Sequence, residues 1–462
     1  MAAPDGIRGR WRAHPGTTTA TALAVAAFLV YNLNLRSISS ADTFPTRYLP
    51  ISILTEGDLD LDEFEFLFVS RYLRSGGEQD GVPYYLQRRR GHYVSTFPVV
   101  PAILATPVYA VPVLLGWTAG PPIGELTRTE MVGTALSKIA SSAAIAVTVA
   151  LTYLSLLRLA TRRVAFWGAF LYAFATSAWA VSSQGLWQSS ASQPLLAGAF
   201  LSLLRARERD SRRDLALAGA LAALAVACRP PALLFAAVLA LYVASRHRRR
   251  LATFLAAPVV VAVLLLAHNL YYFDSPLGGY AEFDRVYFES AAAFARGLAG
   301  LLVSPNRGIL VYSPVLLAAF AGSALMLRRR DDLLRVGLAA ATLATIGFYA
   351  SYSTWYGHFS FGDRFLVETL PAMALLTTEP LAWIGARRWR RTAFATLVAY
   401  SVFVQVVGAF FYPCGWYRSP MQDPSLVARF FDWGDLEVAQ CLAAGPVEPD
   451  GLKALRALRA GP

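Results

Sequence analysis

The sequence contains little charge and very little cysteine. Only 16% of its 462 residues are charged and 3 are Cys, too few for the disulfide framework of a small secreted domain. Hydrophobic residues make up 56% of the chain, and the mean hydropathy is +0.44. These values exclude an ordinary soluble protein. We therefore predict an all-α protein that crosses a membrane many times.

Motifs for metal and nucleotide binding are also missing. No pair of histidines four residues apart accompanies a glutamate, and no glycine-rich loop is placed to hold nucleotide phosphates. We expect no cofactor, although Asp42 with a second outer acid could hold a divalent cation. The net charge of +12 comes from short basic clusters between apolar runs. Such clusters indicate membrane topology and contact with anionic membrane lipids, and we expect no nucleic-acid partner.

The basic clusters predict the orientation of the chain. They occupy 8–12, 158–163, 205–213, 246–250, 328–330 and 387–391, and the positive-inside rule places them in the cytoplasm. The apolar runs give about eleven spans: 17–35, 131–157, 164–181, 189–204, two within 214–244, 251–271, 308–327, 333–352, 365–385 and 392–412. The N-terminus is then cytoplasmic. A membrane domain of residues 1–412 precedes a short extracytoplasmic tail, 413–462.

One more apolar run, 97–117, would reverse this orientation if it crossed the membrane. Its four prolines each remove a backbone donor and disfavour a regular helix. We therefore expect it to be interfacial or re-entrant, the alternative being a kinked span that leaves the 158–163 cluster outside. Residues 37–130 form one large first outer loop in either case. Alternating apolar and charged residues at 64–73 predict a short helix on the membrane surface.

Asp42 follows the first predicted span at the outer membrane surface. An ionisable residue at such a place, facing a cavity built by other helices, is a candidate for a functional site. A carboxylate there can serve as a general base toward a lipid-borne substrate.

A series of motifs follows Asp42 in a definite order. They are SADTFPTRY at 40–48, GHYVSTFP at 91–98, LWQ at 186–188, ACRPP at 227–231, SPNRG at 304–308 with YSP at 312–314, and WYGHFSFGDRF at 355–365. This order resembles the polyprenyl-phosphate-sugar-dependent glycosyltransferases of the GT-C fold, the branch of protein O-mannosyltransferases and lipid A aminoarabinose transferases. Two departures are Thr43, where that family has a second acid, and Phe97-Pro98 in place of Pro-Pro.

The resemblance implies a GT-C bundle with a large first extracytoplasmic loop and an inverting sugar transfer on the outer face. A hexosyl or pentosyl group would pass from polyprenyl phosphate to a hydroxyl of a lipid, glycan or protein acceptor in the cell envelope, with Asp42 as general base. Arginine suits the departing phosphate because its planar fork matches phosphate oxygens. The residues expected to bind the donor phosphate are Arg307, Arg364, Arg229 and Lys138.

Further residues near the outer helix ends are candidates for contacts with the sugar or the acceptor. They are Arg47, His92, Tyr93, Trp187, Gln188, His358 and Asp363. Structural roles are the alternatives: a lysine reaching back to the interface for Lys138, an interfacial anchor or a pair with a nearby acid for Arg307 and Arg364, and an interfacial aromatic for Trp187.

The alternative function is a flippase or other transporter of lipid-linked saccharides. Transporters more often show inverted repeats and polar residues at the bilayer midplane, whereas here the polar residues gather at the outer ends of the spans. A catalytically silent scaffold is a third reading. In the tail, Cys414 and Cys441 both fall on the outer side and are predicted to pair. Residues 452–458 are expected to form a capping helix.

Overall fold

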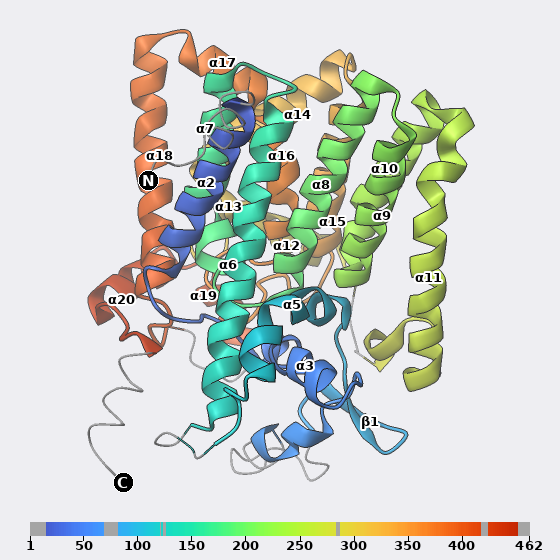
Figure 1. The fold of residues 1–462 in the computed structure, drawn as a ribbon. Coiled ribbons are helices and arrows are strands. Elements are labelled where there is room, and N and C mark those ends of the chain that lie inside the picture. Colours follow the sequence, from blue (N-terminus) through green and yellow to red (C-terminus); the bar gives the residue numbers. More distant parts are fainter. Residues whose placement is uncertain are drawn as a thin grey trace, which may run out of the picture.

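A computed structural model describes residues 15–68, 82–120, 122, 126–282, 287–416 and 424–450. Most of these residues form helices that run along one common direction, and smaller elements cover one end of this bundle (Figure 1). Its helices are α2 (Pro15–Asn32), α6 (Arg128–Leu156), α7 (Arg162–Phe174), α8 (Gln188–Arg209), α9 (Arg212–Cys228), α10 (Leu233–Arg246), α11 (Leu251–Phe273), α12 (Ala291–Val303), α13 (Ile309–Tyr312), α14 (Leu317–Arg329), α15 (Leu333–Ala350), α16 (Leu370–Leu376), α17 (Thr378–Gly385) and α18 (Arg388–Phe410).

Four helical segments in the described part of the chain are long and apolar enough to cross a membrane unaided. They are Arg128–Leu156, Arg248–Phe273, Leu333–Ala350 and Arg388–Phe410. The remaining predicted spans correspond to helices that are shorter, interrupted or less apolar. The run 365–385, for example, is divided into η8 (Val367–Thr369), α16 and α17. The protein is thus a helical membrane protein with several candidate spans, and the number eleven stays a prediction.

Local sequence features determine where these helices begin and how closely they pack. Thr127 and Glu130 form a capping box at the start of α6, which satisfies backbone N–H groups that the first helical turn leaves without partners. Small residues allow close helix contacts. A Cβ atom at Gly219 in α9 would lie 1.9 Å from the carbonyl oxygen of Phe254 in α11. Glycine is therefore required where these two helices meet.

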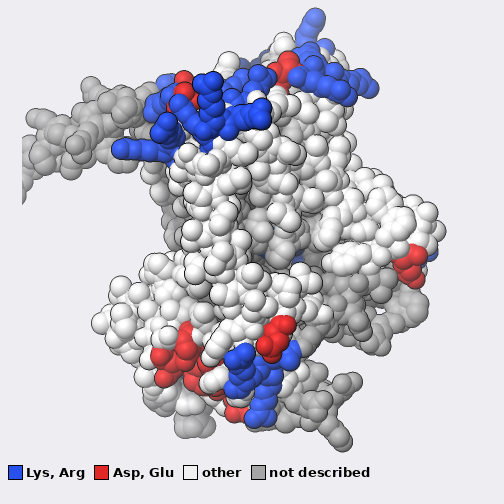
Figure 2. Space-filling view, turned by 90° about the vertical axis from the view of Figure 1, so that its right-hand side faces the viewer, with Lys and Arg blue, Asp and Glu red and all other residues white. Residues whose placement is uncertain are grey.

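The two ends of the bundle differ in charge. On the face shown in Figure 2, basic residues with a few acidic ones crowd the upper end, acidic and basic residues mix at the lower end, and most of the surface between them carries no charge. Ion pairs join the basic clusters across the first end, as between Arg207 and Asp332, whose nitrogen and oxygen lie 2.9 Å apart, and between Arg335 and Glu379. These ion pairs bring the segments around the clusters 205–213 and 328–330 together at one end, whereas the cluster 8–12 lies outside the described residues.

The first outer loop covers the opposite end. It contains η1 (Ala41–Thr43), α3 (Phe44–Thr55), η2 (Asp62–Phe64), the hairpin of β1 (Leu86–Arg89) and β2 (His92–Ser95), and α5 (Val100–Leu114). The expectation of an all-α chain is wrong for the hairpin, whose antiparallel strands pair Leu86 with Ser95 and Arg89 with His92. Both connecting residues, Arg90 and Gly91, have positive φ, as a tight hairpin turn requires.

The proline-rich run forms a regular helix, which the sequence analysis did not expect. Helix α5 retains Pro107 and Pro112 inside it. It lies across the lower end of the bundle beside α3, packed mainly against α3 (Figure 1). A proline in a helix costs one hydrogen bond and some crowding, and burial of Ala105 and Tyr109 on the packed face offsets this. The predicted surface helix 64–73 lies largely outside the described residues.

The C-terminal tail packs against the bundle. It holds α19 (Pro424–Arg429) and α20 (Glu437–Ala444), beside the lower end of α18 (Figure 1). The predicted disulfide between Cys414 and Cys441 is present and ties α20 to the end of α18, whereas Cys228 is a buried free thiol. The expected helix at 452–458 lies outside the described residues.

Candidate active site

Asp42 is held in place by contacts between the first loop and the segment that precedes α8. The backbone N–H of Ile38 donates to the carbonyl oxygen of Gln184 at 2.8 Å. The hydroxyl of Thr46 donates to the carbonyl oxygen of Leu186 at 2.7 Å. These two bonds lie on either side of Asp42 in the sequence, and they fix the short helix η1 that carries it.

The carboxylate of Asp42 has a partner on each oxygen. Arg364 reaches Oδ2 from the loop 351–366, with its Nη1 at 2.7 Å, and the hydroxyl of Tyr84 donates to Oδ1 at 2.5 Å. The side chains of Asp42 and Arg364 are 21% and 12% exposed. The predicted convergence of a carboxylate and a guanidinium is therefore present for Asp42 and Arg364.

The neighbours of Asp42 determine its charge. Burial raises the pKa of Asp42, but Arg364, the hydrogen bond from Tyr84 and the nearby His358 together bring it below the ordinary value. A carboxyl group with a lowered pKa is ionised at neutral pH. Asp42 is therefore available as a base once one of its oxygens is released.

Arg364 lies between two aromatic rings. Its Cζ is 5.0 Å from the ring centre of Trp187 and 5.2 Å from that of Phe365. The Nε of Arg364 and the Nε1 of Trp187 are buried, and neither has a hydrogen-bond partner within the described part of the chain. Two buried donors without acceptors beside a cation suit an anionic ligand.

Arg229 lies in a buried network beside this pair. Its Nε is 2.6 Å from Oε2 of Glu368, and its Nη2 donates to the hydroxyl of Tyr349 at 2.8 Å. The ring of Tyr349 stacks on Phe365 with centres 4.7 Å apart. Arg229 is thus joined to the neighbour of Arg364 through one stacked ring, and its charge is already balanced by Glu368.

His358 and Asp363 flank the arginine in the same loop. Burial, with Arg364 and Arg307 nearby, lowers the pKa of His358 to about 4, so its ring is neutral at pH 7. Burial raises the pKa of Asp363 to about 6 although the hydroxyl of Ser177 donates to Oδ1. The Oδ2 atom of Asp363 is buried and has no partner among the described residues.

Aromatic rings and an amide connect Tyr84 in the first loop with Gln188. The ring centres of Tyr84 and Phe97 are 6.4 Å apart, and those of Phe97 and Tyr280 are 6.2 Å apart. The hydroxyl of Tyr280 donates to Oε1 of Gln188 at 3.0 Å. Gln188 and Trp187, both candidates from the sequence, are therefore linked to the region around Asp42.

Arg307 does not join this site. Its Nη1 is 2.8 Å from Oε2 of Glu437, and its Nε and Nη2 donate to the carbonyl oxygens of Tyr356 and His358. The side chain is 1% exposed. The C-terminal tail thus supplies a buried acid that engages this guanidinium, and the role of Arg307 in binding the donor phosphate stays a prediction.

Lys138 is likewise occupied by the protein. Its Nζ donates to the carbonyl oxygens of Tyr31 and Ser183 and to Oε1 of Gln184, at 2.7 to 3.1 Å. These three bonds use all the donors of an ammonium group. The buried Lys138 of α6 therefore joins α2 to the segment before α8. Its ammonium group has no donor left for a phosphate.

Three further candidates lie elsewhere on the first loop. Arg47 donates to Ser39 and Thr134, and the hydroxyl of Tyr93 donates to Glu65. The Nδ1 of His92 is 2.8 Å from a carboxylate oxygen of Asp62. None of these contacts includes Asp42.

One group on the hairpin side could hold a cation. The ligand atoms of Asp60, Asp62 and His92 lie within 4.8 Å of one another. Asp42 does not belong to this group, and its own partners are the cation Arg364 and the hydroxyl of Tyr84. Among the described residues, Asp42 therefore shares no candidate cation site with another first-loop acid.

Sequence reasoning missed Tyr84, Glu368 and Phe365. Tyr84 lies in an irregular segment before β1, and Glu368 lies in a predicted span. An intramembrane acid is a signal for a partner of opposite charge, and it could have linked Glu368 to Arg229. No local signal points to Tyr84, because its contact with Asp42 joins residues 42 positions apart.

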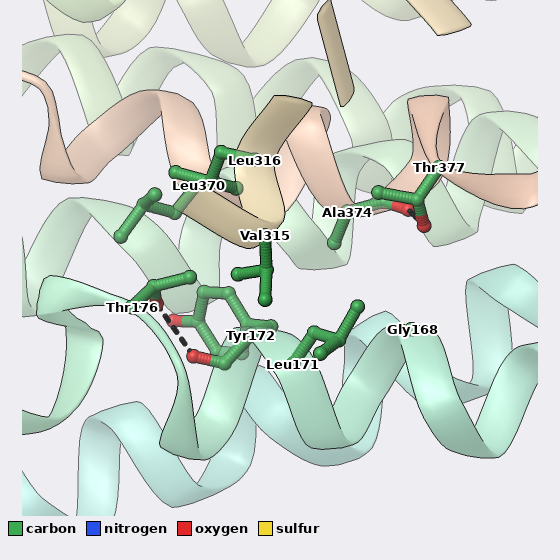
Figure 3. A pocket seen from close by; sticks show the side chains of 9 residues that line it. All are labelled: Gly168, Leu171, Tyr172, Thr176, Val315, Leu316, Leu370, Ala374 and Thr377. Atoms are coloured by element: carbon green, nitrogen blue, oxygen red, sulfur yellow. Dashed lines mark hydrogen bonds between the residues drawn. The ribbon is translucent and has the colours of Figure 1, made fainter. Parts of the chain in front are cut away.

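A separate cavity lies inside the bundle, away from Asp42 (Figure 3). It measures about 10 Å³ and is lined mostly by apolar side chains of α7, η7 (Pro314–Leu316) and α16. In Figure 3 the hydroxyl of Thr176, at its edge, donates to the carbonyl oxygen of Tyr172 at 2.7 Å. A space of this size holds about one water molecule and is far too small for a sugar.

Comparisons with known proteins agree with this architecture. Residues 131–272 match the family described as dolichyl-phosphate-mannose-protein mannosyltransferase. ArnT from Cupriavidus metallidurans in the apo state has a TM-score of 0.51 and 14% identity, over 86% of this chain and 70% of that chain. No curated protein sequence matches the chain.

Two further solved structures are similar at lower scores. ArnT from Cupriavidus metallidurans bound to undecaprenyl phosphate has a TM-score of 0.49 and 13% identity, over 86% of this chain and 70% of that chain. The oligosaccharyltransferase AglB from Archaeoglobus fulgidus, in complex with an inhibitory peptide and a dolichol-phosphate, has a TM-score of 0.43 and 11% identity. The match covers 84% of this chain and 55% of that chain.

The fold and the family match define the class of this protein. It is a membrane glycosyltransferase with the GT-C fold. Within that class, the match to the dolichyl-phosphate-mannose-protein mannosyltransferase family covers residues 131–272.

Proposed function

We propose that this protein moves a sugar from a polyprenyl-phosphate donor to an acceptor hydroxyl on the outer face of the membrane, with Asp42 as the general base. The observation that carries the proposal is the pairing of Asp42 with Arg364, which combines a partly buried carboxylate with a guanidinium whose Nε has no hydrogen-bond partner among the described residues. Base and phosphate ligand are the two groups that such a transfer needs.

The donor class is supported by two observations. The matched family is named for a sugar carried on dolichyl phosphate, a polyprenol-type lipid phosphate. The Arg364 Nε–H and the Trp187 Nε1–H, which have no partner among the described residues, are suited to bind phosphate oxygens. We therefore assign the donor phosphate to Arg364, with Trp187 beside it, and do not assign it to Arg307 or Lys138.

The proposed reaction is a single displacement. The acceptor oxygen forms a bond to the anomeric carbon while the bond between that carbon and the phosphate oxygen breaks. The acceptor proton passes to Asp42, and polyprenyl phosphate leaves with its new charge beside Arg364. The anomeric configuration inverts because the acceptor and the leaving group lie on opposite faces of the sugar.

The ion pair also provides a way to activate the base. In the structure Arg364 and Tyr84 occupy both oxygens of Asp42, and both lower its pKa. A donor phosphate that draws Arg364 away frees Oδ2 and raises the pKa of Asp42 toward its ordinary value. A base with a higher pKa accepts the acceptor proton more readily. Donor binding therefore prepares the site for the acceptor.

Arg229 is assigned a supporting role in this scheme. Its partners Glu368 and Tyr349 leave it neutralised, and the stacking of Tyr349 on Phe365 places this network behind Arg364. We propose that it holds Phe365, and thereby the cation, against the donor.

Replacement of Asp42 by Asn tests the proposal. Transfer from a labelled polyprenyl-phosphate sugar to envelope membranes should fall by roughly 10² to 10⁴-fold, the usual contribution of a general base, while binding of the labelled donor persists. Asp60→Asn is the matched control, because Asp60 lies in the hairpin group and should leave transfer unchanged. Full transfer by Asp42→Asn would refute the assignment of the base. Absence of transfer from the unaltered protein as well would favour a transporter or a scaffold.

A further inference from the structure

The motif at 304–308 holds the C-terminal tail in place. The Nδ2 of Asn306 donates to the carbonyl oxygens of Arg429 and Asp435, at 3.1 and 3.0 Å. The hydroxyl of Ser304 donates to the carbonyl oxygen of Phe430 at 2.8 Å. In return, the backbone N–H of Glu437 donates to Oδ1 of Asn306 at 2.8 Å. The tail is thus bound to the bundle through backbone groups of both α19 and α20.

Glu437 then reaches the interior from the first turn of α20. Its side chain is fully buried, and Oε2 lies 2.8 Å from Nη1 of Arg307 and accepts from the hydroxyl of Tyr312 at 2.8 Å. A buried arginine without its acid would be strongly unfavourable, so this acid orients the guanidinium. The disulfide from Cys441 to Cys414 fixes the helix that carries Glu437.

Arg307 in turn holds the loop that bears Arg364. Its Nε donates to the carbonyl oxygen of Tyr356 at 3.0 Å, and its Nη2 donates to that of His358 at 3.3 Å. The residue between these two carbonyls is Gly357, which has a φ of +71°. The ring of Tyr356 also stacks on Phe430 of the tail, with centres 4.7 Å apart.

The side chain of Arg364 packs directly against Gly357. A Cβ atom at Gly357 would lie 3.1 Å from Cγ and 3.2 Å from Nε of Arg364. The side chain of Arg364 thus passes directly over this glycine on its way to Asp42. The contacts form one continuous path: Glu437, Arg307, the backbone at 356–358, Arg364 and Asp42.

We infer that Glu437 is a positioning residue for sugar transfer, acting through Arg307 to hold Arg364 against Asp42. The C-terminal tail is then a working part of the active site although it contributes no group to the reacting atoms. This inference rests on the proposed function, since its effect is read in transfer of the sugar.

The experiment is a double-mutant cycle between Glu437→Gln and Arg364→Lys, with kcat/KM for sugar transfer measured across pH. Glu437→Gln alone should lower kcat/KM by roughly 10- to 100-fold, the scale of a small misplacement of a catalytic group. The double variant should be about as slow as Arg364→Lys alone, because both changes remove the same interaction. In Glu437→Gln, the acid limb of the pH profile of kcat/KM should also move to higher pH, because Arg364 is no longer held against Asp42 and no longer lowers its pKa.

Two further variants guard against loss of folding. Arg307→Lys keeps a cation for Glu437 but lacks the planar fork for both carbonyls, so it should reproduce the slow transfer and the shifted acid limb. Glu379→Gln breaks an ion pair at the basic end of the bundle and should leave the profile unchanged.

The outcomes are distinct. Losses that multiply in the double variant, an acid limb that stays in place, or normal transfer by Glu437→Gln and Arg307→Lys would overturn the inference. No transfer by the unaltered protein would instead overturn the proposed function.

Discussion

At the scale of single residues, the candidate active site is defined by the groups that hold the carboxylate of Asp42. Arg364 and Tyr84 hold one oxygen each, and both contacts bridge segments that are distant in the sequence. Tyr84 is the weaker partner by charge, and its side chain belongs to an exposed residue. It is therefore the group that an acceptor hydroxyl could replace at Oδ1.

Tyr84→Phe tests this view of the carboxylate. The change removes a hydrogen bond that lowers the pKa of Asp42, so the acid limb of kcat/KM should move to higher pH. At neutral pH, where Asp42 stays ionised, transfer should change by less than about tenfold. A pH titration of transfer measures both effects. Tyr93→Phe is the control, because its hydroxyl donates to Glu65 on the hairpin side. A limb that does not move would show that Tyr84 does not act on Asp42.

Asp363 gives a prediction about stability. Its pKa is raised to about 6 in the folded protein, above the ordinary value of 3.8, so the folded state disfavours the ionised form. The penalty is fully present above pH 6 and fades as pH falls from 6 toward 4. Asp363→Asn should therefore stabilise the protein at pH 7, by about 2 to 3 kcal/mol, and lose this advantage near pH 4. Thermal unfolding in detergent at both pH values measures the difference. An advantage that is equal at the two pH values would contradict the raised pKa.

At the scale of elements, the site is assembled from three loops and a tail. Helix η1 brings Asp42, the segment before α8 brings Trp187, and the loop 351–366 brings Arg364. Each loop follows or precedes a helix of the bundle, so the rigid helices fix where the loops begin and end. The tail packs beside these loops, at the end of α18.

The disulfide should be needed to keep the tail in place. A link across 27 residues restricts the unfolded chain and contributes roughly 3 to 4 kcal/mol in the loop-entropy model. Replacing Cys414 and Cys441 together by Ser should lower the unfolding temperature in detergent and increase cleavage of the tail by added protease. Cys228→Ala is the control, since Cys228 is a free thiol in another part of the bundle. An unchanged unfolding temperature in the double variant would contradict this role.

At the scale of the whole molecule, charge separates the two ends. The basic end and the mixed end lie on opposite sides of an uncharged belt, as a protein that spans a membrane requires (Figure 2). We propose that the basic end faces the cytoplasm and that Asp42 and the tail lie outside. In this orientation the proposed site does not face the cytoplasm, where nucleotide sugars are found. It faces the side on which a lipid-linked donor can reach acceptors of the cell envelope.

Labelling of single cysteines tests the orientation. Trp433 in the tail is 64% exposed and Trp389 at the start of α18 is 65% exposed, so the two positions are matched in access. In a Cys228→Ala background, a membrane-impermeant maleimide should label Trp433→Cys in intact cells and Trp389→Cys only after permeabilisation. The reverse pattern would place the site in the cytoplasm.

The sequence by itself determined the class of a helical membrane protein and singled out Asp42, and the number of spans that it predicts stays a prediction. These follow from hydrophobic runs, basic clusters and one acid beside the first span, all of which are local in the chain. Only the tertiary structure decided which cation meets that acid. Arg307 and Arg364 stand in similar motifs, yet Glu437 engages the first while the second reaches Asp42. A pairing between distant segments depends on how helices and tail pack, and a local pattern does not contain that information.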